Sequence, residues 1–211
     1  MASNKFFGSL SEAFMRTTPV TVGAAMIMIV GNFPYQGWLD FLSNIGLTDH
    51  FNGLVAATTG IISLFIVFNF SYTYANKSNQ DGLSAGLISL ASFFIVMPSL
   101  RMGVDYEIAS TAPEIYTEIF PMCDAFSQYF TGGMAIFTAI IVASITSFLF
   151  VKMNEKGLGI KLPESVPSNV SASLSPSIIA TIIFVMWFII RVGFSYTPFH
   201  SLQNIVGIFT L

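Results

Sequence analysis

Side chains able to perform catalysis are few in this 211-residue chain, and none forms a pattern typical of an enzyme. The sequence contains no HExxH, Walker or GxSxG motif. His50 and His200 fall in predicted loops or near an end, where an interfacial polar role is favoured over metal ligation. Cys123 is the single cysteine, so no internal disulfide can form, and no neighbouring residue would activate its thiol. We therefore identify no catalytic residue, predict no cofactor or metal, and leave open whether the chain is an enzyme.

The composition indicates an integral membrane protein. Hydrophobic residues make up 54% of the chain and charged residues 9%, whereas a soluble domain usually carries about 25% charge. The 22 phenylalanines and 10 methionines suit surfaces that face lipid or pack between helices. A net charge of −3 gives no basic surface for a nucleic acid. The lipid bilayer is therefore the first predicted partner.

Five stretches without a charged residue or histidine are long enough to cross a bilayer as helices. Transmembrane strands would need only about 10 residues each, with alternating polarity. We therefore predict an all-α fold, with a five-span membrane domain over residues 17–194 and an approach to a further element over 195–211. The predicted spans are 17–33, 53–75, 83–100, 126–151 and 174–190.

The residues before the first span predict a short amphipathic helix. Phe6, Phe7, Leu10 and Phe14 recur at helical spacing within residues 1–16, which is typical of a helix lying in the membrane interface. A signal peptide is the less favoured alternative, because the sequence GNFPYQG follows the span in place of a small-residue cleavage site.

Lysine and arginine residues set the predicted orientation. With the N-terminus in the cytoplasm, six of the eight basic residues fall on the inner side and two, Arg101 and Arg191, on the outer side. The predicted inner loop, 152–173, is polar, and the outer stretch from Arg101 to Gln128 is acidic. The six inner basic residues are Lys5, Arg16, Lys77, Lys152, Lys156 and Lys161.

Small residues in the second and third spans predict close helix packing. We favour packing within the chain over a dimer seam at these positions. Asn32 and Asn69, polar residues in apolar surroundings, are expected to hydrogen-bond neighbouring helices rather than a ligand. No ionisable group within the spans could form a site for a polar solute. The helix-packing residues are Gly53, Ala57, Gly60, Gly82 and Gly86.

Three stretches carry a family resemblance. The first is FMRTTPVTVGAA, residues 14–25; the second is DGLSAGLISLASF, residues 81–93, followed by Met97-Pro98; the third is IKLPESVPSNVSAS, residues 160–173. Together they resemble the N-terminal half of subunit IIC (EIIC) of the phosphoenolpyruvate-dependent sugar phosphotransferase system (PTS). The lactose/cellobiose/diacetylchitobiose type is the nearest branch. The order and spacing of the stretches agree along nearly the whole chain.

The resemblance implies half of a ten-helix, dimeric sugar permease in a bacterial plasma membrane. The family's first five helices mainly form the oligomerisation scaffold and its last five hold the sugar, which subunit EIIB phosphorylates as it reaches the cytoplasm. The implied partners are the PTS subunits EIIB and EIIA. The resemblance also marks a cytoplasmic-loop motif that we expect to be ordered and docked on the membrane domain. Its residues are Lys161, Pro163, Val166, Pro167, Val170 and Ser173.

The leading hypothesis is therefore an EIIC permease that translocates a β-disaccharide such as cellobiose, lactose or chitobiose for phosphorylation by EIIB. We expect this chain to be a truncated or split form that retains the dimerisation scaffold, and no sugar-binding residue is identifiable in it. It would associate as a homodimer or with the missing half. The alternatives are a non-transporting membrane protein that dimerises with or regulates full-length permeases, or a decayed remnant.

Overall fold

The structure is a computed structural model that describes residues 2–97, 100–102, 123–125, 130–158, 176–197, 202 and 205–206. The predicted loop motif from Lys161 to Ser173 and most of the acidic outer stretch lie outside these residues, as does His200. Cys123 lies on a short strand, and His50 is exposed on a helix.

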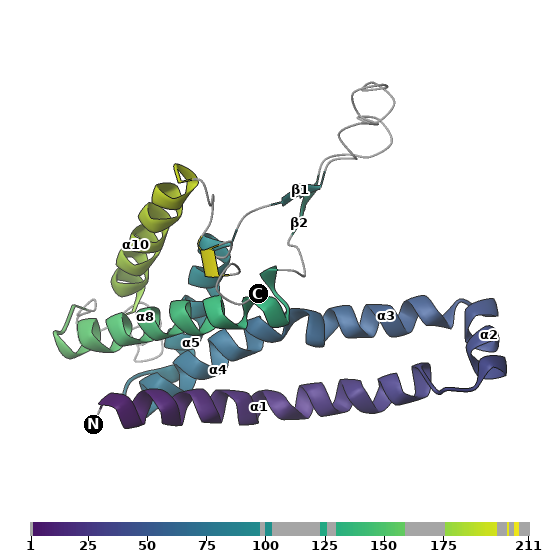
Figure 1. Cartoon of the computed structure of the whole chain (residues 1–211). Coiled ribbons are helices and arrows are strands. Elements are labelled where there is room, and N and C mark those ends of the chain that lie inside the picture. The colour runs from purple at the N-terminus through teal and green to yellow at the C-terminus, as the bar shows by residue number, and fades with distance from the viewer. Residues whose placement is uncertain are drawn as a thin grey trace, which may run out of the picture.

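Helices account for nearly all of the described structure (Figure 1). The one strand pairing among the described residues is antiparallel, between two strands of three residues each, with Leu100 opposite Ala125. In chain order the elements are α1 (Ala2–Gly31), α2 (Gln36–Asn44), α3 (Leu47–Ala57), η1 (Thr59–Ile61), α4 (Ile62–Asn76), α5 (Gly82–Val96), β1 (Leu100–Met102), β2 (Cys123–Ala125), η3 (Gly133–Ala135), α8 (Ile136–Glu155) and α10 (Ser177–Ser195).

The predicted all-α membrane fold is confirmed. Four helical segments are long and apolar enough to cross a bilayer: Asn4–Gly31, Leu47–Asn76, Gly133–Glu155 and Ser177–Ser195. The third predicted span, 83–100, corresponds to α5, which has 15 residues and extends about 22 Å, less than the roughly 30 Å of a hydrocarbon core. Met97 ends α5 in an extended conformation, as expected for the residue before a proline.

Helix α1 joins two units that the sequence analysis separated. Its 30 residues continue from the predicted interfacial helix into the first span without a break at residue 16. Pro19 lies inside α1 and cannot donate a backbone hydrogen bond. The hydroxyls of Thr17 and Thr18 bond back to the carbonyls of Ala13 and Phe14, at 2.8 and 3.0 Å. Phe6 and Leu10 pack against the core, so the N-terminal part of α1 belongs to the bundle.

The predicted second span is divided in two. The helical segment begins at Leu47, earlier than predicted, and is interrupted at Thr58, whose backbone angles of −123° and −84° are not helical. Helix α2, which no pattern in the sequence analysis predicted, lies across the far ends of α1 and α3 (Figure 1).

Helix α4 is central to the bundle, in contact with α1, α5 and α8, while α10 packs on α5 and α8. The first part of α1 packs on α4, and its last part runs beside α3, away from the other helices (Figure 1). The bundle buries a mixture of aromatic, branched and small side chains, including Ala13, Phe70, Ala85, Phe93, Ala143, Phe150 and Ile183.

Two of the predicted packing glycines lie where α5 approaches α4 most closely. A Cβ atom built on Gly86 would be 2.7 Å from the Phe68 ring, and one on Gly82 would be 2.6 Å from the Tyr72 carbonyl oxygen. A Cβ on Gly53 would meet nothing within 4 Å. Ala57 is exposed, and Gly60 accepts a hydrogen bond through its carbonyl. The close approach therefore belongs to the α4–α5 hairpin.

Replacing Gly82 with alanine should destabilise the protein by about 1–3 kcal/mol, because a backbone atom blocks the new methyl group and cannot move aside cheaply. Thermal unfolding in detergent measures the effect. Gly53→Ala is the matched control: the site is open, and alanine favours a helix interior over glycine by about 1 kcal/mol. Equal destabilisation by the two substitutions would contradict the packing role of Gly82.

Candidate functional site

The described residues contain no conventional reaction centre, since no group of three or more histidine, cysteine or acidic side chains is placed to hold a metal ion. The features with functional potential are an apolar cavity and the polar contacts that join the helices.

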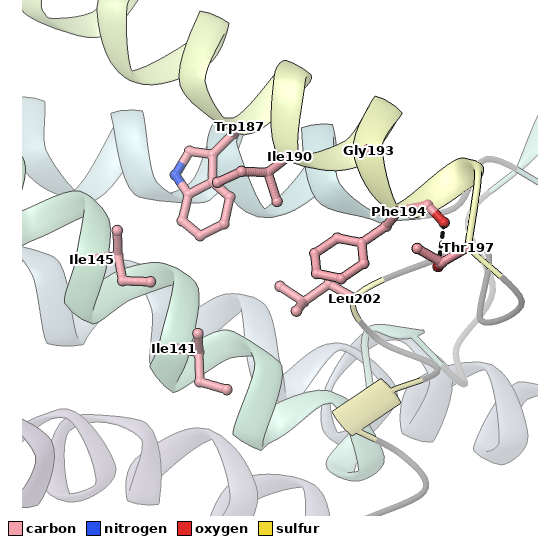
Figure 2. A pocket seen from close by; sticks show the side chains of 8 residues that line it. All are labelled: Ile141, Ile145, Trp187, Ile190, Gly193, Phe194, Thr197 and Leu202. Atoms are coloured by element: carbon pink, nitrogen blue, oxygen red, sulfur yellow. Dashed lines mark hydrogen bonds between the residues drawn. The ribbon is translucent and has the colours of Figure 1, made fainter.

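The cavity lies between α8 and α10 and has a volume of about 490 Å³ (Figure 2). The hydroxyl of Thr197, at its edge, donates to the Phe194 carbonyl at 2.7 Å. The indole nitrogen of Trp187 donates to the Thr146 hydroxyl at 2.8 Å. Both polar side chains are thus already engaged, so the cavity fits hydrocarbon better than a sugar. Its lining residues are Ile141, Ile145, Trp187, Ile190, Gly193, Phe194, Thr197 and Leu202.

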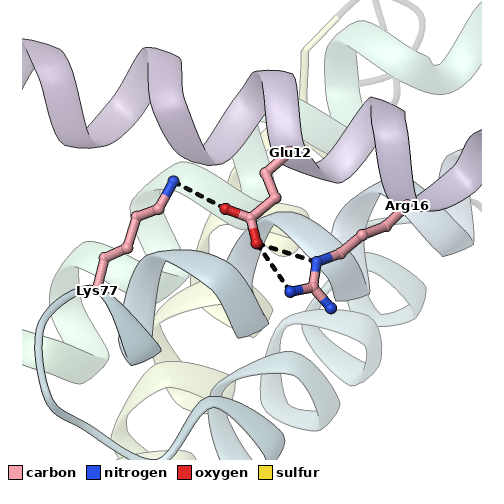
Figure 3. Close-up of polar contacts among 3 residues, drawn as sticks. All are labelled: Glu12, Arg16 and Lys77. Carbon is pink, nitrogen blue, oxygen red and sulfur yellow. Dashed lines mark hydrogen bonds and ion pairs between the residues drawn. The ribbon is translucent and has the colours of Figure 1, made fainter.

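A charged cluster connects α1 to the end of α4 (Figure 3). Glu12 accepts from Arg16 at 2.8 and 3.1 Å and pairs with Lys77 at 3.0 Å. The Arg16 guanidinium also lies 5.4 Å from the centre of the Tyr72 ring. Arg16 and Pro19 belong to the first stretch that carries the family resemblance. Because these side chains are 31–47% exposed, the pairs contribute only about 0–1 kcal/mol in water and mainly fix the register of the two helices.

A second set of polar contacts closes the break between α3 and α4. The Thr131 carbonyl accepts from both the backbone nitrogen and the hydroxyl of Ser63, at 3.0 and 2.6 Å. The Thr131 hydroxyl donates to the Gly60 carbonyl at 2.9 Å. Backbone groups freed by a broken helix at membrane depth need such partners, because lipid offers none. Thr131, which precedes η3 and α8 in the chain, therefore stabilises the interruption of the second span.

Arg191 makes a contact between helices that the sequence analysis missed, because that analysis placed Arg191 outside the last span. The structure places it on α10, which continues to Ser195. The side chain is half-buried and donates to the Ile95 carbonyl at 3.0 Å. The last carbonyls of a helix lack intrahelical partners and attract cations, so Arg191 caps the short helix α5. An arginine within the apolar run IIRVGF was the available signal.

The two asparagines differ from each other. Asn32 donates its side-chain amide to Met28 of its own helix at 3.2 Å, not to a neighbouring helix as expected. Asn69 lies on α4 and is half-buried. Neither asparagine lines the cavity between α8 and α10.

Comparison with known proteins gives the family. The model of the family described as "Phosphotransferase system, EIIC" matches residues 11–210. The chain belongs to this family. The resemblance predicted from the three sequence stretches is therefore confirmed.

Relatives match nearly the whole chain but less than half of their own length. The galactose-specific EIIC component of Lactococcus lactis subsp. cremoris (strain MG1363) is 41% identical over 206 residues, 97% of this chain and 46% of the relative. The cellobiose-specific EIIC component of Geobacillus stearothermophilus is 28% identical, over 99% of this chain and 45% of the relative. The chain thus spans just under half the length of these EIIC proteins, in agreement with the prediction of one half of a IIC subunit.

A solved structure shares the fold. The crystal structure of ChbC, the IIC component of the N,N′-diacetylchitobiose-specific phosphotransferase system, superimposes with a TM-score of 0.82 at 24% identity. The match covers 98% of this chain and 46% of ChbC. The helical arrangement described above is therefore that of part of an EIIC permease.

Removing the Thr146 hydroxyl, which accepts from Trp187, should destabilise the α8–α10 contact. Thr146→Val keeps the side-chain shape but leaves the buried Trp187 N–H without an acceptor, which costs about 1–3 kcal/mol. Thr181→Val is the control, because Thr181 is exposed and bonds only within α10. A lower melting temperature and altered Trp fluorescence for Thr146→Val alone are expected; unchanged values would show that the bond does not hold α10 in place.

Proposed function

We propose that this chain is the scaffold half of an EIIC sugar permease and that it translocates sugar together with the further half present in its relatives, in one polypeptide or two. This proposal rests on one observation: nearly the whole chain matches less than half of each relative. Several polar side chains of the described helices, among them Ser71, Trp187 and Arg191, bond a neighbouring helix, which supports a scaffold role. EIIB and EIIA are the proposed partners of the complete permease.

For the sugar, we propose galactose or a β-galactoside such as lactose. The galactose-specific relative shares 41% of aligned residues, whereas the cellobiose-specific relative from Geobacillus stearothermophilus shares 28%. Cellobiose, which belongs to the wider β-disaccharide class, is the comparison sugar in the test.

The proposed orientation puts the N-terminus in the cytoplasm of a bacterium, with the chain crossing the plasma membrane several times. Lys77, linked to α1 through Glu12, marks the inner end of the bundle, and Lys152 in the last turn of α8 belongs to the same side. Residues 1–16 would then enter the inner interface as the start of α1, exposing Phe7 and Phe14. The predicted loop 152–173 begins inside α8, which ends at Glu155. The stretch that follows α8, with its motif from Lys161 to Ser173, would face the cytoplasm and dock on the bundle.

Sugar uptake tests the proposal. Residues 1–211 expressed alone in cells that supply EIIB and EIIA should give no uptake of labelled galactose, lactose or cellobiose. Co-expression with the second half of the galactose-specific relative should restore uptake, with galactose or lactose preferred over cellobiose. Expression of that second half alone is the control. Robust uptake by residues 1–211 alone would contradict a scaffold role.

We also propose that the chain forms a homodimer, and a separate observation supports this assembly. Along the part of α1 that extends beyond the bundle, the apolar side chains of Val22, Met26 and Ile29 remain exposed at helical spacing. Spacings of four and three residues place them on one face. This stripe would pair with the same stripe of a second chain. It could equally pair with a full-length permease, as the alternative of a non-transporting protein that regulates such permeases requires.

Cross-linking tests the seam. In a Cys123→Ser background, Met26→Cys should give a covalent dimer with a short bifunctional maleimide in membranes. Phe137→Cys is the matched control, because Phe137 is similarly exposed, at 57% against 66% for Met26, but lies on α8. Equal cross-linking from both positions would contradict a seam on α1.

A further inference from the structure

The segment that joins α1 to α3 concentrates aromatic side chains at one end of the molecule. Phe33, Tyr35, Trp38 and Phe41 fall within nine residues of sequence, and three of them are at least half exposed: 55% for Phe33, 65% for Tyr35 and 50% for Phe41. Tryptophan and tyrosine are enriched where membrane proteins pass from hydrocarbon to water, because their rings are apolar and their N–H and O–H groups are polar.

Helix α2 has two faces. Leu42, its one buried residue, faces the protein, and Trp38 beside it is half-buried. Phe41 and Ile45 are exposed, each at 50%. Leu39 is half-buried, and the polar residues share one face of the helix: the Gln36 amide donates to Asp40 at 2.9 Å, and Ser43 and Asn44 lie beside them. A short helix with this division lies in an interface plane rather than across a membrane.

Trp38 also fixes α2 to the helix that it covers. Its indole nitrogen donates to the Val30 carbonyl at 2.8 Å, and its ring stacks on Phe41 with centroids 5.7 Å apart. Val30 is in the last turn of α1, where carbonyls lack intrahelical partners. The bond therefore sets α2 across the end of α1, as Figure 1 shows.

The distance along α1 matches a bilayer. From Lys5 to Gly31 the helix rises about 39 Å, and a bilayer with its interfacial regions is about 40–45 Å thick. Lys5 and the Glu12–Lys77 pair lie at one end of this length, and α2 lies at the other. When the lysine end of α1 lies among the headgroups of one leaflet, α2 therefore lies among the headgroups of the other leaflet.

We propose that α2, with Phe33 and Tyr35, is an interfacial anchor that binds the headgroup–acyl boundary of the leaflet opposite the lysine end and fixes the depth of the scaffold. The anchor binds phospholipid generally, through ring burial at the boundary. At that depth, the capped end of α5 at Ile95 and Arg191 lies below the headgroups, because α3 extends 11 residues, about 16 Å, beyond the break that opens α4.

Trp38 is a natural reporter of this position, because the chain has two tryptophans and the other, Trp187, is 1% exposed. Residues 1–211 would be reconstituted in phosphatidylcholine vesicles whose acyl chains carry bromine either near the headgroup or near the bilayer centre. The quenching of tryptophan fluorescence by each lipid would then be measured. The fluorescence quenching that comes from Trp38 is the difference between the intact chain and the Trp38→Phe variant. The Trp187→Phe variant, in which Trp38 is the remaining tryptophan, measures the same quenching independently. We expect shallow bromines to quench Trp38 at least about twofold more than deep ones.

A charge on the exposed apolar face gives a second readout. Phe41→Asp should reduce shallow quenching and shift Trp38 emission to longer wavelength, whereas Ser43→Asp on the polar face should change neither. Strongest quenching by deep bromines would overturn the proposal by placing α2 in the hydrocarbon core. Absence of quenching at every depth would overturn it by showing that protein, such as a second copy, covers the segment. None of these outcomes depends on sugar transport.

Discussion

Lipid offers no hydrogen-bond partner, so polar groups of the backbone within a membrane must be satisfied by the protein itself. Hydroxyl and amide side chains return hydrogen bonds to the carbonyl four residues earlier, as Ser92 does to Ile88 and Asn154 to Phe150. The same constraint shapes the two places where a helix stops at depth. Thr131 satisfies the break before α4, and Arg191 caps α5.

Packing in this environment depends on fit, because apolar side chains gain little by leaving lipid for one another. Glycines at positions 82 and 86 let α5 approach α4, and the small side chain of Ala13 is fully buried where α1 meets the core. Aromatic rings fill the wider spaces, and Phe6 meets Phe70 edge to face at 5.5 Å. Trp187 combines both requirements, since it fills volume between α8 and α10 and bonds Thr146.

The molecule has two parts with different exposure. The bundle around α4 buries its contacts, whereas the extension formed by the end of α1, α2 and α3 leaves large apolar side chains uncovered. In an EIIC protein of twice this length, such surfaces suit a second copy, the further half or lipid. The proposed dimer seam on α1 and the proposed anchor on α2 assign two of these surfaces to separate partners.

The sequence alone determined the class, the helical character and the family. Charge-free windows of about the length of a membrane helix can be recognised irrespective of how they pack. The stretches at 14–25, 81–93 and 160–173 indicate EIIC by residue order. Gly82 and Gly86 were predicted to pack closely along with Gly53, Ala57 and Gly60, and the sequence did not separate the two that approach α4 from the other three.

The tertiary structure decided what depends on contacts between distant positions. It joined residues 1–16 to the first span, since Phe6 and Leu10 meet the core contributed by later helices. It divided the second span at Thr58, where Thr131, some 70 positions later, supplies the bonds. It also turned Arg191 from a loop residue into the cap of α5. Hydropathy measures the transfer of one segment into lipid, whereas helix ends and registers depend on which partner satisfies each polar group.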